Sequence, residues 1–435
     1  MIGWINEYII GVALPAYLLI TGIYFGFRLR WFHILHPVKC IGFALSGDRK
    51  RAVSALTLAL AGTLGVGNMV GVASALAIGG CGAVFWMWVS AAFAMILKYS
   101  EIVLSIRHMF YEGGEGRGGA TYYIRNIFLS LRLPAAGKIL SALFAVLFAI
   151  NALTMGSMLQ SGAVSQAMSI GFSVPLPIGS AAIALLTLSV CVAGKRGVMR
   201  VTERIVPIMT LCVLVLSAAV LILRAEEIPE AFGRIFEGAA DFRAAGGGIL
   251  GFLLSDAVRL GTMRGLISNE AGCGTSPTAH AEAGATCAAR QGIFGIFEVF
   301  VDTILLCTVT ALVIIVSHVP LDETDLMGIT LGAYSSVLGR WSEYPVAASV
   351  VCFGFATVVC WSHYGCEGVY YLCRHPAAKT VFTVIFSLSV FLGGVISPDA
   401  VWGISDLAIG AMTLINLTVL LLGRDQIVEE TRRIP

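Results

Sequence analysis

Long apolar runs limit the fold of this chain more than any other feature of its sequence. A helix needs about 17–25 predominantly apolar residues to cross a lipid bilayer. Runs of this kind lie near residues 5–27, 52–80, 83–107, 138–167, 177–194, 201–223, 246–287 (interrupted), 291–318, 344–372, 379–395 and 398–422. They predict an all-α integral membrane protein with eleven transmembrane helices.

The composition agrees with this prediction and excludes several functional classes. Only 12% of the residues are charged, whereas soluble domains carry about 25%. The formal net charge is +2 and no dense basic block occurs, so nucleic acid is not expected as a partner. The 11 cysteines show no CxxC spacing and are interpreted as small core residues. No basic residue precedes Arg28, so the first run is expected to remain as a membrane helix rather than a signal peptide.

The basic residues predict an orientation for the helices. Of the 28 Lys and Arg residues, most fall in alternate connections, such as 28–51, 107–138 and 195–204. The opposite connections hold few basic residues and most of the acids. The chain is therefore expected to lie in the cell membrane (plasma or inner membrane). The positive-inside rule places its N-terminus outside and its C-terminus in the cytoplasm.

The spans also suggest an internal repeat. Without the first helix, ten spans form two groups of five, and an odd number per group requires the groups to insert with opposite topology. Inverted repeats of this kind are typical of secondary transporters. The predicted layout is a helix and basic cytoplasmic linker (1–51), a first repeat (52–224), an extracytoplasmic connector (225–245), a second repeat (246–423) and a cytoplasmic tail (424–435).

The first span of each repeat is interrupted. In the first repeat the segment 62–68 reads GTLGVGN, and in the second the segment 268–277 reads SNEAGCGTSP. Small residues can simply permit close helix packing, and the second segment can be a loop at the membrane surface. Alternatively both helices unwind, which leaves backbone groups that only a cavity, an ion or a ligand can satisfy at membrane depth.

Unwound helices suit a particular ligand. The amide ends of half-helices carry a positive partial charge that can hold a carboxylate. Freed carbonyl oxygens can coordinate a small cation such as Na⁺. No basic side chain lies in the first break, so the backbone would have to bind a carboxylate. The pattern favours a small zwitterion that is carried together with a cation.

Several motifs resemble one known family. These are the stretch 62–73, the stretch GGCGAVFWMW at 79–88, KYSE at 98–101, SNEAG at 268–272 with AHA at 279–281, and WSHYG at 361–365. At these residues the chain resembles the alanine or glycine:cation symporter (sodium:alanine symporter) family. The matching segments run in order from about residue 52 to 372.

The resemblance implies a leucine-transporter-like fold of five plus five helices, with the first and sixth core helices broken. It implies Na⁺-driven uptake of alanine, glycine or similar small neutral amino acids, with Na⁺ as the coupling ion and no organic cofactor. The residues that it assigns to the substrate are Val66, Gly67, Asn68, Gln160, Asn269 and Trp361, and those that it assigns to sodium are Gly62, Gly65 and Thr357.

The chain departs from the family pattern at two positions. Val66 stands where the family usually has Thr, and Cys81 stands where it usually has Pro. The first change touches the expected substrate site and concerns the choice of amino acid. The second lies in a turn outside the membrane core.

Charged residues inside the spans admit other interpretations. Lys98 and Glu101 are i, i+3 neighbours and are expected to form an ion pair at a helix end. Glu270 is expected to be held by Arg259 or Arg264, or to carry the proton of an H⁺-coupled carrier. A membrane-embedded sensor or enzyme is the remaining alternative, although the chain offers neither a nucleophile–base pair nor a large output domain.

Overall fold

The computed structural model describes residues 13–46, 49–112, 115–239, 255–282 and 287–434. The protein is all-helical in these ranges except for one antiparallel hairpin, β1 (Phe110–Glu112) and β2 (Glu115–Arg117). The start of the first predicted span, residues 5–12, lies outside the described residues, and its remainder forms α2 (Leu14–Arg28).

Each predicted span contains helix, but not every helix is long enough to cross a bilayer by itself. Seven helices in the described ranges are long and apolar enough, or eight if one bent pair counts as a single span. The seven are α7 (Gly82–Arg107), α9–η3–α10 (Pro134–Phe172), α12 (Gly194–Leu223), α17–η6–α18 (Ala288–Ser317), η7–α20 (Arg340–Leu372), α21 (Pro376–Gly393) and most of α22 (Pro398–Leu422). The count of eleven stays a prediction, because α2 and α11 (Leu176–Val192) are shorter.

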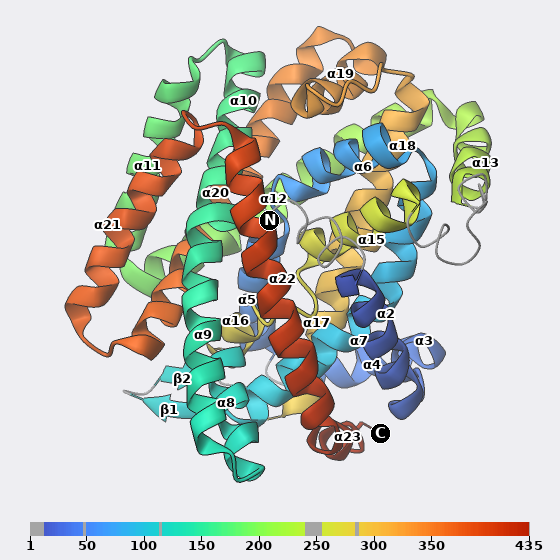
Figure 1. The fold of residues 1–435 in the computed structure, drawn as a ribbon. Coiled ribbons are helices and arrows are strands. Elements are labelled where there is room, and N and C mark those ends of the chain that lie inside the picture. The colour runs from blue at the N-terminus through green and yellow to red at the C-terminus, as the bar shows by residue number, and fades with distance from the viewer. Residues whose placement is uncertain (1–12, 47–48, 113–114, 240–254, 283–286, 435) are drawn as a thin grey trace.

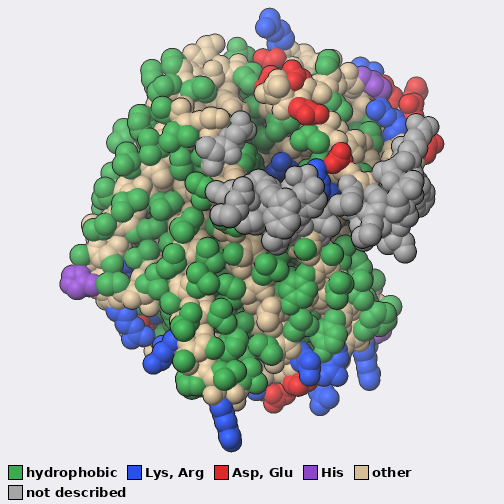
Figure 2. Space-filling model, viewed as in Figure 1, with side chains coloured by type: hydrophobic (Ala, Val, Ile, Leu, Met, Phe, Trp, Pro, Cys, Tyr) green, Lys and Arg blue, Asp and Glu red, His purple; other side chains and the backbone are tan. Residues whose placement is uncertain are grey.

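The outer surface of the helix bundle carries a hydrophobic band. Figure 2 shows green side chains over the middle of the molecule and charged side chains gathered at its two ends. Large apolar side chains on the outer helices are exposed, among them Leu185, Ile208 and Ile222. Such a surface is unfavourable in water and favourable against lipid tails.

Short helices cap both ends of the bundle. α8 (Ala120–Ser130) lies beside the hairpin at one end, and α19 (Leu326–Leu338) lies at the opposite end (Figure 1). Other short helices are α3 (Phe32–Leu35), α4 (Pro37–Leu45), η4 (Ala225–Glu227), α13 (Ile228–Ala239) and α23 (Arg424–Thr431). α13 and α19 lie in connections between predicted spans, after 201–223 and after 291–318 respectively.

Two broken helices lie inside the bundle. The first consists of α5 (Arg49–Thr63), the π-helical turn η2 (Gly67–Gly71) and α6 (Val72–Gly79), and its halves are bent by 51°. The second consists of α15 (Asp256–Asn269) and α16 (Pro277–Glu282). α15 packs against α6 and η2, whereas α16 packs against α5, so the two breaks face one another.

Candidate functional site

The first break redirects two backbone amides. The N–H of Gly65 donates to the Thr63 carbonyl at 2.7 Å, and the N–H of Val66 donates to Oε1 of Gln160 at 3.1 Å. In a continuous helix these amides would bond to the carbonyls of Ala61 and Gly62, four residues earlier. Both carbonyls therefore lose their helical partners. This loss indicates an unwound segment and not a straight helix whose glycines merely permit close packing.

A hydroxyl from another helix lies at the same place. Thr357 of α20 donates its Oγ1 hydrogen to the Ala61 carbonyl at 2.9 Å. A Cβ atom added to Gly65 would lie 2.7 Å from Gln160 Oε1 and 3.0 Å from Thr357 Oγ1. Glycine is required here because the oxygens of two other helices approach the backbone. Carbonyl, amide and hydroxyl oxygens, all hard donors, thus gather around the end of α5.

The second break is held by two residues distant in the sequence. Gly272 and Gly274 have φ of 84° and 77°, a left-handed backbone that glycine adopts without strain. Asn416 of α22 donates to the Gly272 carbonyl at 2.8 Å, and the N–H of Gly274 donates to Oε1 of Glu101 at 2.8 Å. Asn416 also donates to Glu101. These bonds satisfy the backbone that the break exposes.

The predicted ion pair between Lys98 and Glu101 is wrong. Glu101 accepts bonds from the second break, whereas Lys98 lies 3.2 Å from Glu298 and donates to Ser276 at 2.9 Å. Lys98 and Glu101 are neighbours on α7 but do not pair with each other. The Glu101 side chain reaches the second break, and the Lys98 side chain reaches Ser276 in that break and Glu298 on α17 (Ala288–Val299).

Glu270 also has another partner than the one expected. The Thr275 hydroxyl donates to its Oε2 at 2.6 Å, within the same break. Arg259, one of the two expected partners, pairs with Asp256 at 2.9 Å. Arg264, the other, stacks on Trp402 with its guanidinium carbon 5.0 Å from the ring centroid.

A cavity of about 230 Å³ lies between the two breaks. Five of the predicted site residues line it, namely Gly62, Gly65, Val66, Gly67 and Gln160. Thr357 lies behind this wall, bonded to the Ala61 carbonyl. A cavity of this size has room for several water molecules, and so for a small amino acid.

Asn68, Asn269 and Trp361 do not line this cavity. Asn68 donates to Oδ1 of Asp302 at 2.7 Å, and Asn269 donates to Oγ1 of Thr303 at 3.1 Å. Both amides therefore brace the breaks against η6 (Phe300–Cys307). Their part in substrate binding stays a prediction.

Trp361 is fully buried in an aromatic cluster. Its ring lies 6.0 Å from that of Phe148 and 5.6 Å from that of Tyr364. A Cβ added to Gly156 would lie 2.4 Å from the indole, so η3 (Thr154–Leu159) packs directly on it. The indole supports the helices around the cavity from behind.

Sequence reasoning missed several lining residues. Arg264 was expected to neutralise Glu270, yet it lines the cavity itself. An ionisable residue inside a span is a signal for such a role. Met155, Trp402 and Glu323 also line the cavity. They come from other helices or a loop, and no local pattern marks them.

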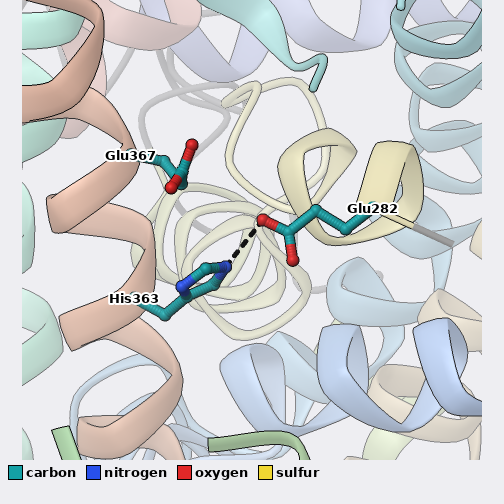
Figure 3. Close-up of side chains that lie close together, drawn as sticks. All are labelled: Glu282, His363 and Glu367. Atoms are coloured by element: carbon teal, nitrogen blue, oxygen red, sulfur yellow. Dashed lines mark hydrogen bonds and ion pairs between the residues drawn. The ribbon is translucent and has the colours of Figure 1, made fainter. Parts of the chain in front are cut away.

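Three side chains at the hairpin end approach one another like metal ligands. Glu282, His363 and Glu367 each offer a ligand atom, and these atoms lie within 4.8 Å of one another (Figure 3). His363 is hydrogen-bonded to Glu282 at 2.7 Å. His363 and Glu367 share one face of α20 at i, i+4 spacing.

Basic side chains already occupy these carboxylates. Lys195 lies 3.0 Å from Glu282, while Arg117 and Lys379 each lie 2.7 Å from Glu367. A divalent cation would have to displace them against their charge. We name Arg117, Lys195, Glu282, His363, Glu367 and Lys379 the hairpin-end ion-pair cluster, and it joins β2, α12, α16, α20 and α21.

The chain resembles known transporters along its whole length. A model of the sodium:alanine symporter family matches residues 1–433. The sodium/alanine symporter AgcS of Methanococcus maripaludis is 35% identical over 445 residues, which cover 99% of this chain and 96% of that protein. The probable sodium/glutamine symporter GlnT of Bacillus subtilis is 30% identical over 438 residues, 96% of this chain and 88% of that protein.

A solved structure shares the fold. A crystal structure of a mutant manganese transporter from Eremococcus coleocola superposes with a TM-score of 0.52 at 12% sequence identity, and the match covers 86% of this chain and 76% of that one. At this identity the likeness concerns the fold alone. It agrees with the all-helical, multi-pass architecture described above.

Proposed function

Since the chain belongs to the sodium:alanine symporter family, we propose that it imports a small neutral amino acid, such as alanine or glycine, together with Na⁺. The family is one of transporters, and the described residues contain several helices of membrane-spanning length. The finer statement, symport with sodium by alternating access, rests on the first break.

The observation that carries the proposal is the break at Gly65 and Val66, which opens into the cavity. Gly67 begins the second half-helix, whose amide end carries positive partial charge. A Cβ at Gly67 would meet no atom within 4 Å, so there is space beside this backbone. We propose that the substrate carboxylate binds there, with Val66 and Gln160 beside it.

The sodium ion is proposed to bind at the end of α5. The carbonyls of Ala61 and Gly62 have lost their helical donors, and the Thr357 hydroxyl is bonded to the Ala61 carbonyl. Oxygen ligands of this kind are those a hard monovalent cation requires. Because the same break supplies the amides for the substrate and the carbonyls for the ion, the binding of one would favour the binding of the other.

We further propose eleven spans, with the N-terminus outside and the C-terminus in the cytoplasm. The five-plus-five inverted repeat with boundaries at 52–224 and 246–423 is supported by the equivalent positions of the two broken helices. The basic segments at the hairpin end support the orientation.

Uptake by purified protein in liposomes tests the function. With a tenfold inward Na⁺ gradient and a potential of 100 mV, one ion supplies roughly 1.4 plus 2.3 kcal/mol, enough to concentrate alanine several-hundred-fold. We expect labelled alanine to accumulate with Na⁺ and not with choline. Equal uptake in both salts would contradict sodium coupling.

Proton coupling is the second candidate, and Glu270 is the residue that favours it. This carboxyl lines the cavity, is 1% exposed and accepts a bond from Thr275. A relative of Bacillus subtilis, 28% identical, is named a putative sodium/proton-dependent alanine carrier. Uptake that follows a pH gradient without Na⁺, and that is lost in Glu270→Gln, would support this function.

A further inference from the structure

Arg264 is a basic residue of the cavity that the proposed function leaves without a role. Its side chain lies on α15, on the same helical face as Ile267 and Ser268, and all three line the cavity. Four residues of α-helix rise about 6 Å, so Arg264 sits roughly one turn from Ser268 and the second break.

The surroundings of Arg264 leave part of its guanidinium available. Its Nε is inaccessible to solvent and has no hydrogen-bond partner among the described residues. The planar group stacks on Trp402 of α22, which fixes its orientation without using its N–H donors. A buried donor without a partner is costly, and a carboxylate is the ligand that matches a guanidinium best.

The charged residues of the cavity suit a zwitterion. Among the described lining residues, only Arg264, Glu270 and Glu323 carry charged side chains. Glu270 accepts a bond from Thr275 inside the break, whereas Glu323 is exposed on the loop before α19. A cation whose Nε has no hydrogen-bond partner among the described residues and an exposed acid together attract a molecule with both a carboxylate and an ammonium group.

Arg264 lies toward the end of the cavity away from the first break. That end is lined by Glu323 and Thr324, which precede α19, and by Pro398 and Trp402 of α22. The loop before α19 and the α21–α22 turn, which supply these residues, lie at the end of the molecule opposite the hairpin (Figure 1). A substrate entering there would meet Arg264 before it reached Val66 and Gly67.

From this placement we infer that Arg264 forms an outer subsite that binds the carboxylate of the entering amino acid and passes it to the first break. The inference rests on the proposed function. The charge of Asp406 on α22 acts on Arg264 and competes with the substrate carboxylate for it. The alternative role of Arg264 is a structural one, in which Asp406 is its permanent partner.

Alanine uptake by liposome-reconstituted Arg264→Gln tests the subsite. Loss of a charge-assisted bond raises the half-saturation concentration for alanine by about tenfold, with Na⁺ half-saturation unchanged. Arg259→Gln is the matched control, because Arg259 lies on the same helix but pairs with Asp256 and is not among the lining residues. Arg264→Lys, which keeps the charge without the planar fork, regains only part of the affinity.

Asp406→Asn separates the two roles of Arg264. If Arg264 serves the substrate, removal of its competitor leaves alanine half-saturation equal to wild type or lower. A rise as large as that of Arg264→Gln shows that the pair is structural and overturns the inference. So does wild-type half-saturation in Arg264→Gln. Absence of Na⁺-driven alanine uptake in the wild type contradicts instead the proposed function on which the subsite rests.

Discussion

Thr357 is the side chain on which the sodium proposal depends most directly. Its hydroxyl contacts the Ala61 carbonyl, which the first break leaves without a helical donor. We expect Thr357→Val to raise the Na⁺ concentration for half-maximal uptake about tenfold, since the isosteric side chain lacks the oxygen, while Thr357→Ser stays close to wild type. Transport assays at varied Na⁺ measure this directly.

Thr330→Val is a suitable control for that experiment. Thr330 is fully buried, but its hydroxyl is bonded to the Leu326 carbonyl of its own helix. Its loss should leave the Na⁺ dependence unchanged. If both valine variants behave alike, the Thr357 hydroxyl is a packing feature and not a sodium ligand.

Val66 is the second residue with a measurable consequence. It lines the cavity, and its backbone N–H is already bonded to Gln160. We expect Val66→Thr, the residue usual in the family, to tighten alanine binding by about ten- to a hundred-fold, because the added hydroxyl can donate to a carboxylate. Both side chains are β-branched and suit the same backbone.

Val70→Thr provides the comparison for Val66→Thr. Val70 also lines the cavity, one turn further along, inside η2. Competition assays against alanine should show the gain only for Val66→Thr. Equal effects at the two positions would mean that the hydroxyl acts through general polarity and that Val66 does not face the carboxylate.

At the scale of the helices, the shape of the second break depends on a brace from α22. Asn416 donates to the Gly272 carbonyl and to Glu101. We expect Asn416→Ala to lower the unfolding free energy by about 1–3 kcal/mol, because buried partners lose their bonds, and to reduce alanine uptake with it. A melting curve in detergent measures the loss, and Asn126→Ala, at a half-buried amide on α8, is the comparison. Unchanged stability would mean that the break holds its form without the brace.

The hairpin-end ion-pair cluster makes a separate prediction about metals. Its carboxylates are neutralised by Arg117, Lys195 and Lys379, so a divalent cation gains little there. We expect EDTA to leave the melting temperature unchanged, and Glu367→Gln to lower it, since Lys379 loses its ion-pair partner and Arg117 keeps only Glu112. Zinc or manganese retained stoichiometrically after dialysis would contradict this interpretation.

The sequence predicted where the helices break but not what holds the breaks. Clustered glycines and a proline at 62–68 and 268–277 are local signals of unwinding. The bond between Glu101 and Gly274, by contrast, joins residues 173 positions apart, and no periodicity along one helix reveals such a partner. For the same reason Lys98 and Glu101 were wrongly paired. Gln160, which the family resemblance assigns to the substrate, lies at the first break, where its Oε1 accepts a bond from the Val66 N–H, and its part in substrate binding stays a prediction.

At the scale of the whole molecule, the described helices form one bundle with two unlike ends. The hairpin end carries the connections rich in Lys and Arg, and α19 lies at the opposite end (Figure 1). The segment that leads into α19 carries Asp322, Glu323 and Asp325. The cavity extends toward the α19 end. If the positive-inside rule holds, substrate enters from outside and the hairpin-end cluster lies on the cytoplasmic side.

One native thiol reports on this orientation. Cys373, in the turn between α20 and α21, is the single exposed cysteine among the 11, all of which lie in the described part of the chain. A charged, membrane-impermeant maleimide should leave it unmodified in intact cells and label it after permeabilisation, with the signal lost in Cys373→Ser. In that background, Leu321→Cys on the exposed loop before α19 should be labelled in intact cells. The reverse labelling pattern would show that the protein has the opposite orientation in the membrane. Arg264 would then lie on the path of substrate that leaves for the cytoplasm and not of substrate that enters.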